Sequence, residues 1–453
     1  MSFLKKLFGG GSEEPKGNDS APKVANSSAA SHKTVKFGRF TDCNKDSNQM
    51  VHWDKCIKAF QEKRYVDSYE AFLNYVKDHE LDNVTISRNG DQLKFELIQG
   101  SNVIHGIGSG KDFVAYTNIA SMDTPSIPVM RKLMSINYGL KYSKFALDGT
   151  SICMKFSSHA IDASPNKLYA GLKELAKKAD QQDDLLISEF SSLKEMGGEH
   201  VAARDQSRVD IKYKYLTKWL NETKDEVSKM NFQKDAGGIS FLLLDLSYKI
   251  DYLIAPQGVL TNSLELIQVE FFKKSKATTA ERNTYIIKEF EAIMAQPKEK
   301  IVEGLYDVAC TFGIANAANH KTVMDKISKE REKVAWYRDN GFPQVQQAVY
   351  GYMVSYAFFN YGMKYPITDL LNIAMHVLTP DYYREMGDEN QFVGSDGKLN
   401  GGRIKAAIGH IMAYSKKDYP FIQMNTATLN YTNPSNFIDS LLQLVDKVDL
   451  RKK

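Results

Sequence analysis

The segment from residue 83 to residue 118 constrains the fold of this chain more than any other, because its side chains alternate in polarity. It reads NVTISRNGDQLKFELIQGSNVIHGIGSGKDFVAYTN. Alternation with a period of two is typical of β-strands that bury one face. The alternating positions are Val84 and Ile86, then Leu93, Phe95 and Leu97, then Phe113, Ala115 and Thr117. RNGD predicts a two-residue hairpin turn, since Asn-Gly tolerates positive φ, and QGSN and GSGKD predict two more turns. The segment therefore predicts an antiparallel sheet.

The glycines from Gly106 to Gly110, followed by Lys111, invite comparison with a phosphate-binding loop. A Walker loop, G-x-x-x-x-G-K-[ST], would need glycine at His105 and a hydroxyl residue at Asp112. Both positions fail, and the residues that follow are β-patterned, whereas a phosphate loop opens a helix. The sequence predicts a hairpin turn here and no nucleotide cofactor.

Segments with helical spacing flank the alternating region. Structure is expected from about residue 48, and residues 50–79 predict one long helix or a helical hairpin that bends near residues 63–65. Residues 124–139 predict a helix that ends at Gly139, with Met130, Leu133, Met134 and Ile136 as its apolar positions. Residues 164–196 predict a long helix with Ser164 as N-cap and a buried stripe that extends to Phe190 and Leu193. The order predicts an α+β domain over residues 41–200.

Beyond the MGG sequence near residue 197, nearly every segment has the period of a helix. Residues 201–453 predict an all-α domain of eight to ten helices with no strand. One of these helices is expected to begin at Pro297 and to continue through the sequence KEKIVEGLYDVACTFGIANAA.

The first ten residues, MSFLKKLFGG, predict a short amphipathic segment. Its candidate docking residues are Phe3, Leu4, Lys5, Lys6, Leu7 and Phe8. They would contact a membrane surface or a groove on a partner, although two helical turns are marginal in water and the segment could equally be a frayed tail. Residues 11–40 are poor in large apolar side chains and predict a disordered linker.

Composition excludes several classes of protein. The net charge of +4 over 453 residues predicts no nucleic-acid partner. Four scattered cysteines without a CxxC pair predict free thiols in the cytoplasm and no structural zinc. The uncharged run from residue 348 to residue 363 is shorter than the roughly 20 residues that a membrane span needs. His320, His376 and His410 are isolated, and no catalytic, cofactor-binding or metal-binding residue is predicted.

The run LMSINYGLKYSKFALDGTSICMKFSSHAIDASPNKLYAGLKELAKKADQQDDLL carries the family resemblance of this chain. A helix ends in SIN, a KFALD strand follows, and after a turn and a second strand comes a long helix through LAKKAD. With these features, residues 48–200 resemble the YbjN-like proteins, which are similar in fold to type III secretion chaperones. The resemblance implies an α-β-β-β-α-β-β-α module that dimerises and binds peptides or partner proteins. It implies no reaction and says nothing of residues 201–453.

Three hypotheses follow. The first is a non-catalytic, chaperone-like or adaptor protein of the cytoplasm that binds a protein or peptide and could form a homodimer through the α+β domain. The second is an enzyme with its site in the helical domain or in the cleft between the domains. The third is a scaffold at a membrane surface, held there peripherally by residues 1–10.

Overall fold

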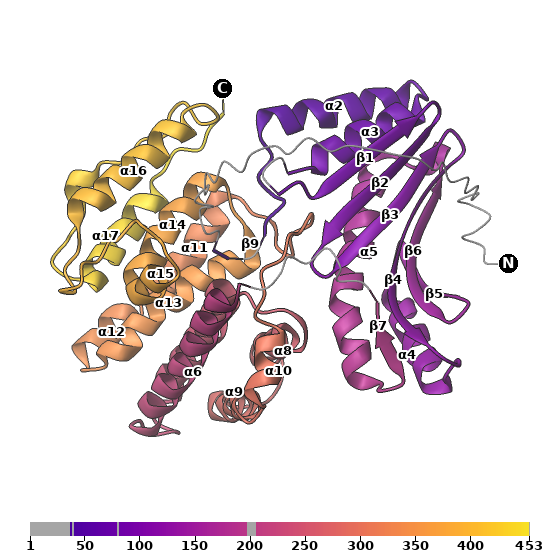
Figure 1. Cartoon of the computed structure of the whole chain (residues 1–453). Helices are drawn as coiled ribbons and strands as arrows, with labels where there is room; N and C mark the ends of the chain where they lie inside the picture. The colour runs from indigo at the N-terminus through magenta and orange to yellow at the C-terminus, as the bar shows by residue number, and fades with distance from the viewer. Residues whose placement is uncertain (1–36, 39, 79–80, 197–204, 453) are drawn as a thin grey trace, which may run out of the picture.

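The structure is a computed structural model that describes residues 37–452, apart from residues 39, 79–80 and 197–204. A sheet with its covering helices forms one lobe, and a second lobe is built almost entirely of helices (Figure 1). The predicted fold class, an α+β domain followed by a helical domain, is confirmed.

The sheet is antiparallel throughout and has the order β1-β2-β3-β4-β6-β5, with β7 paired to the end of β4. Its strands are β1 (Val84–Asn89), β2 (Gln92–Gln99), β3 (Asn102–Ser109), β4 (Asp112–Met122), β5 (Ser143–Asp148), β6 (Ser151–His159) and β7 (Leu193–Glu195). All three predicted turns join neighbouring strands, and Gly90 and Gly100 both have a φ of 58°. Four strands precede the middle helix, one more than the YbjN-like resemblance implies.

The glycines of β3 are explained by packing. A Cβ atom at Gly106 would collide with the Phe95 ring, and one at Gly108 would collide with the Tyr69 ring. Both rings are buried in the core of the domain. The glycine-rich sequence therefore gives two aromatic rings room against the sheet, and Lys111 lies in the turn after it.

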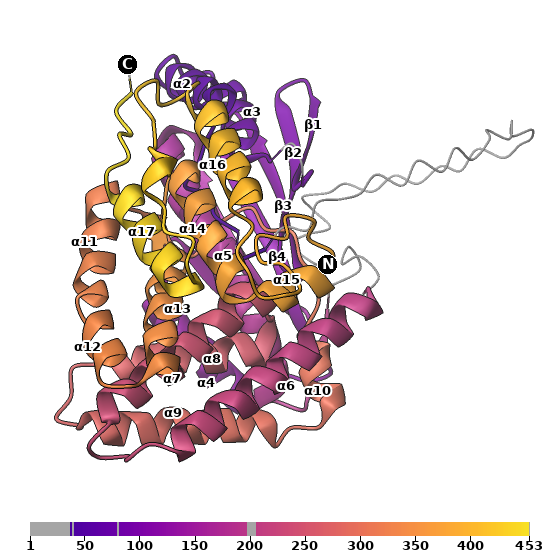
Figure 2. The same ribbon diagram turned by 90° about the vertical axis from the view of Figure 1, so that its left-hand side faces the viewer.

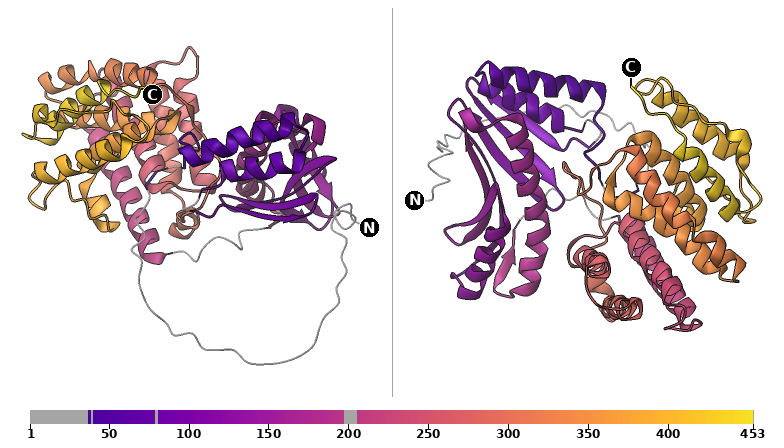
Figure 3. Two further views of the ribbon diagram at one scale, coloured as in Figure 1. Left: turned by 90° about the horizontal axis from the view of Figure 1, so that it is seen from above. Right: turned by 180° about the vertical axis from the view of Figure 1, so that it is seen from behind.

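Helices cover one face of the sheet (Figure 3). They are α2 (Ser47–Gln61), α3 (Tyr65–Val76), α4 (Ile127–Gly139) and α5 (Pro165–Glu189). Residues 48–77 thus form a helical hairpin. Asp46 caps α2 in a capping box with Gln49, and Ser164 accepts a hydrogen bond from the Lys167 amide, as its predicted N-cap role requires.

The prediction for the end of α5 is wrong by several residues. The helix ends at Glu189, and Leu193 lies in β7, where it pairs with Met122 of β4. Leu193 is still buried, so the apolar pattern predicted its burial but not its conformation. A short apolar run at the end of a helix could continue the helix or form a strand. The sequence does not decide between them, because the pairing of β7 with β4 is a long-range contact.

The helical domain has more helices than predicted. In the described part of the chain they are α6 (Gln206–Ser228), α7 (Ala236–Lys249), α8 (Gly258–Phe272), α9 (Thr279–Met294), α10 (Lys298–Glu303), α11 (His320–Arg331), α12 (Val334–Asp339), α13 (Pro343–Asn360), α14 (Tyr365–Leu378), α15 (Pro380–Glu385), α16 (Gly401–Ser415) and α17 (Pro434–Asp446). The α14 helix packs between α16 and α17, while α6 and α9 run below them (Figure 2). The expectation of no strand is also wrong, since β8 (Asn316–Ala317) pairs in parallel with β9 (Tyr361–Gly362).

The largest error concerns the helix expected to follow Pro297. Pro297 is the N-cap of α10, but that helix ends at Glu303. Residues 305–315 have no regular secondary structure and cross to the α+β domain. Ile301 and Leu305 stay in the helical core, whereas Phe312 is buried in the core of the other domain, a long-range contact that the local pattern cannot show.

Candidate functional site

The α4 helix has apolar side chains on two opposite faces. Val129 and Leu133 are buried against the α+β core. Of the predicted apolar positions of this helix, Leu133 is buried, whereas Met134 points to solvent. Ile127, Met134 and Tyr138 lie on the opposite face and are 68%, 72% and 95% exposed. A helix of a globular domain ordinarily carries polar residues on its solvent side. We call this exposed stripe, together with the exposed Tyr142 and Leu147 beside it, the α4 surface.

The edge strand β5 next to the α4 surface already has hydrogen-bond partners. The Asn137 side chain accepts from the Phe145 amide at 2.7 Å and donates to its carbonyl at 3.1 Å. Glu174 accepts from the amides of residues 141–143 at 2.8–3.2 Å, which lowers the pKa of its carboxyl although partial burial opposes the shift. Such bonds protect an edge from pairing with another strand. A partner at the α4 surface must therefore pack on side chains.

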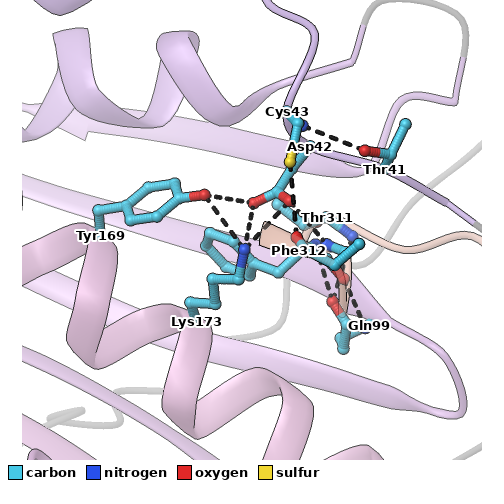
Figure 4. A network of polar contacts seen from close by, with 10 residues as sticks. Thr41, Asp42, Cys43, Gln99, Tyr169, Lys173, Thr311 and Phe312 are labelled. Atoms are coloured by element: carbon cyan, nitrogen blue, oxygen red, sulfur yellow. Dashed lines mark hydrogen bonds and ion pairs between the residues drawn. The ribbon is translucent and has the colours of Figure 1, made fainter. Parts of the chain in front are cut away.

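A second candidate site lies where the two domains meet (Figure 4). Residues 308–315, which we call the strap, leave the helical domain and contact the α+β domain. The Phe312 side chain is only 2% exposed and belongs to the core of the α+β domain, where its ring meets the Tyr169 ring edge-on at 5.7 Å. A residue from the C-terminal half thus completes the core of the N-terminal half.

The side chain of Gln99 pairs with the backbone of the strap (Figure 4). It accepts from the Phe312 amide at 3.0 Å and donates to the Phe312 carbonyl at 3.3 Å. An amide that bonds both groups of one residue reproduces a hydrogen-bonded pair of an antiparallel sheet. Phe312 is therefore held as if by a neighbouring strand.

Further polar contacts surround the strap. The Thr311 hydroxyl donates to the Ile98 carbonyl at 2.8 Å and accepts from Asn83 at 2.9 Å. The Gly100 amide donates to the Ala309 carbonyl at 3.0 Å. Thr311 and Asn83 are fully buried, so these bonds satisfy groups that would otherwise be costly to bury.

Asp42 joins the strap to helix α5. Its carboxylate accepts from the Gly313 amide at 3.1 Å, from the Lys173 ammonium at 3.1 Å and from the Tyr169 hydroxyl. Burial, and then the bond to Asp42, raise the pKa of Tyr169, so the phenol stays a donor at neutral pH. We call Asp42, Asn83, Gln99 and Tyr169, with the backbone of residues 98–100, the seat of the strap.

A third candidate site is a cavity of about 500 Å³ within the helical domain, between α6, α7, α13 and the start of α15. Asp245 and Lys249 line it as an ion pair at 3.1 Å, and the Lys249 ammonium lies over the Trp219 ring. Burial raises the pKa of Asp245, although Lys249 opposes the shift. Gly351 leaves room for the Asp245 carboxylate, because a Cβ there would collide with it. A cavity of this size would hold a small molecule.

The residues singled out from the sequence lie elsewhere. Phe3, Leu4, Lys5, Lys6, Leu7 and Phe8 are outside the described residues. His376 stacks on Tyr383 at 3.5 Å and pairs with Asp388 at 3.0 Å. The cavity beside that pair is about 10 Å³, which suits one water molecule rather than a substrate. Sequence analysis missed the strap and the cavity, whose residues are far apart in the chain. It placed Met134 among the apolar positions of its helix, but helical spacing alone did not show that Met134 and Tyr138 are exposed.

Over the ranges that the structure describes, no group of three or more His, Cys, Asp or Glu side chains is placed to hold a metal ion. Within the same ranges, no helix combines the length and the apolar character needed to cross a bilayer. Comparisons of the chain with protein-family models and with curated proteins find no match. The YbjN-like resemblance stays a prediction.

Proposed function

We propose that this chain is a non-catalytic protein-binding protein, chaperone-like or adaptor in character, that forms a homodimer through its α+β domain. The observation that carries the proposal is the α4 surface. Three large apolar side chains on one helix face, Ile127, Met134 and Tyr138, are more than two-thirds exposed. Contiguous exposed apolar side chains of this kind mark protein contacts.

A second copy of the chain is the occupant that we propose for the α4 surface. The hydrogen bonds from Asn137 and Glu174 leave strand addition at β5 unfavourable, so the contact is made by side chains. An apolar helix face packs well against another, and a two-fold axis would place Tyr138 near Ile127 of the second copy. The YbjN-like resemblance, which implies dimers, supports the same choice.

Sedimentation velocity of the full chain tests the proposal. We expect a dimer at micromolar concentration, and we expect the double variant Met134→Asp/Tyr138→Asp to weaken it at least about tenfold, because two carboxylates would be buried without partners. Ile161→Asp is the matched control, since Ile161 is 71% exposed but follows β6 at the other end of the sheet. A wild-type chain that stays monomeric would refute the homodimer, and so would a double variant as dimeric as wild type.

A second candidate function is enzymatic, and the cavity at Asp245 and Lys249 favours it. A carboxylate and an ammonium that line a cavity can exchange protons with a bound molecule. Thermal-shift assays of the full chain against small metabolites test this candidate. It predicts that some compound stabilises wild type but not Lys249→Met, and a compound set that stabilises neither chain would count against it.

The third hypothesis concerns residues outside the described ranges, and it remains a proposal of peripheral membrane contact through Phe3, Leu4, Leu7 and Phe8. In this hypothesis the protein lies at a membrane surface. The alternative is a protein that is not bound to a membrane in the cytoplasm, which the unpaired cysteines favour. Nothing in the net charge of the chain favours a nucleic-acid partner.

A further inference from the structure

The strap is attached to the helical domain at both ends, independently of the seat. On one side, Asp307 pairs with Lys212 at 2.8 Å and with Arg208 at 2.9 Å, both on α6. On the other side, residues 316–317 pair with β9. Residues 308–315 therefore form a loop that the helical domain presents to the α+β domain.

The seat has the features of a peptide-binding site. Gln99 and Asn83, both at least 96% buried, recognise the backbone and a hydroxyl, while Phe312 fills an apolar position beside Tyr169. Asp42 accepts from the amide of Gly313, and a Cβ at Gly313 would approach the backbone of Phe40 and Thr41 to 2.8–3.0 Å. The seat thus distinguishes three successive residues: a hydroxyl residue, an aromatic residue and a glycine.

We infer that the seat is a binding site for a partner segment of the form Thr/Ser-Phe-Gly, and that the strap occupies it in cis until such a segment replaces it. This inference rests on the proposed function as a protein-binding protein, but it uses a surface distinct from the α4 surface. The recognition follows sheet-like backbone pairing plus one side-chain anchor, which is a common mode of peptide binding. The strap acts as an intramolecular competitor, so a partner binds with reduced apparent affinity while the strap is seated.

A labelled peptide with the sequence of residues 307–316, DVACTFGIAN, tests the inference by fluorescence anisotropy with the full chain under reducing conditions. We expect the Phe312→Ala chain to bind the peptide at least about tenfold more tightly than wild type, because its own strap has lost the anchor. A peptide with alanine in place of the phenylalanine should not bind. Ile314→Ala is the matched control chain, since Ile314 is in the strap but 42% exposed, and it should behave as wild type.

Two further variants keep the inference falsifiable if Phe312→Ala fails to fold. Thr311→Val keeps the shape of the strap but removes its hydroxyl bonds, and it should raise peptide affinity by a smaller factor. Adding Gln99→Leu to either strap variant should abolish peptide binding, because the backbone partner is lost. Equal binding by all chains, or binding by none of the chains that fold, would overturn the inference.

The outcomes separate this inference from the proposed homodimer. Peptide binding should persist when Tyr138→Asp is added, since Tyr138 belongs to the α4 surface and not to the seat. Alternatively, the seat could receive the strap of a second copy. In that case wild type would be a dimer that Phe312→Ala converts to monomers without peptide binding, and the inference would be wrong.

Discussion

Each of the two domains receives one phenylalanine from the other half of the chain, and the two contacts differ in kind. Phe312, from the C-terminal half, is buried in the α+β core, and hydrogen bonds hold its backbone. Phe37, from the N-terminal side, is only partly buried on the helical core, where its ring lies 4.4 Å from that of Tyr383. Phe312 is bound through both its backbone and its side chain, whereas Phe37 contacts the rings of the helical domain.

The two halves are therefore interlocked as well as joined by the continuous chain. Phe37 lies in the range predicted as a linker, and the residues just after it, Asp42 to Asn44, bond to both the strap and the helical domain. Hydrogen bonds to a segment that crosses between domains can discriminate between amino-acid sequences. An aromatic ring that crosses between domains mainly adds binding energy. The strap is therefore the crossing segment to which we assign recognition.

The largest effect should come from removing the two rings. We expect Phe312→Ala to lower the free energy of unfolding by about 4 kcal/mol, because it empties a fully buried site, and Phe37→Ala by about 2 kcal/mol. Urea unfolding followed by circular dichroism measures both. Equal losses of unfolding free energy in the two variants would contradict the difference between the two contacts.

Replacing the amide that holds the strap should have the next largest effect. Gln99→Leu leaves the amide and carbonyl of Phe312 buried without a partner, so we expect a loss of about 2 kcal/mol in the same urea assay. Asn137→Leu is the matched control, because Asn137 bonds the Phe145 backbone in the same way but at a sheet edge that water can reach. We expect about 0.5 kcal/mol there, and a larger loss for Asn137 than for Gln99 would contradict the account.

The turn beside the seat should make the free energy of unfolding depend on pH, and this effect should be smaller than the two above. Asp183 accepts hydrogen bonds from Ser101 and Asn102, while burial and the nearby Asp184 raise the pKa of its carboxyl. The neutral acid is thus favoured in the fold. Stability is complete below the pKa of about 4 found in unfolded chains, and it falls as the pH rises toward the raised folded pKa.

Urea midpoints on either side of neutral pH measure this dependence. We expect wild type to be less stable at about pH 8.5 than at about pH 5.5, and Asp183→Asn to reduce the difference. The amide of asparagine can still accept from Ser101, which makes the variant a close match. If wild type and Asp183→Asn lose the same stability between the two pH values, titratable groups other than Asp183 cause the pH dependence.

The smallest effect concerns the N-terminal segment. Deleting residues 1–10 should reduce sedimentation with anionic vesicles by less than about tenfold, because one short anchor binds a membrane weakly. The Met134→Asp/Tyr138→Asp chain serves as a comparison that leaves the segment intact. Unchanged vesicle binding after the deletion would remove the membrane-surface hypothesis.

Sequence reasoning succeeded where the signal is local. The β1–β2 turn and the Ser164 cap depend on neighbours in the chain. The cap is found as predicted, and the turn lies in the predicted RNGD sequence, although Asn89 ends β1 and the two loop residues are Gly90 and Asp91. It failed at Phe312, whose hydrogen-bond partner Gln99 is 213 positions away. Met134 was predicted as an apolar position of its helix together with Leu133, yet only Leu133 is buried. Helical spacing identifies a face, but which face a core covers depends on the elements around it.

Hydrogen exchange by mass spectrometry on the full chain tests the central claim, that the strap is seated in the α+β domain, most directly. The amides of Thr311, Phe312 and Gly313 all donate to side chains of the seat. We predict that they exchange as slowly as the amides of β2 and β3, and faster once excess DVACTFGIAN peptide is added. Exchange at the rate of an exposed loop, with no response to the peptide, would contradict the account.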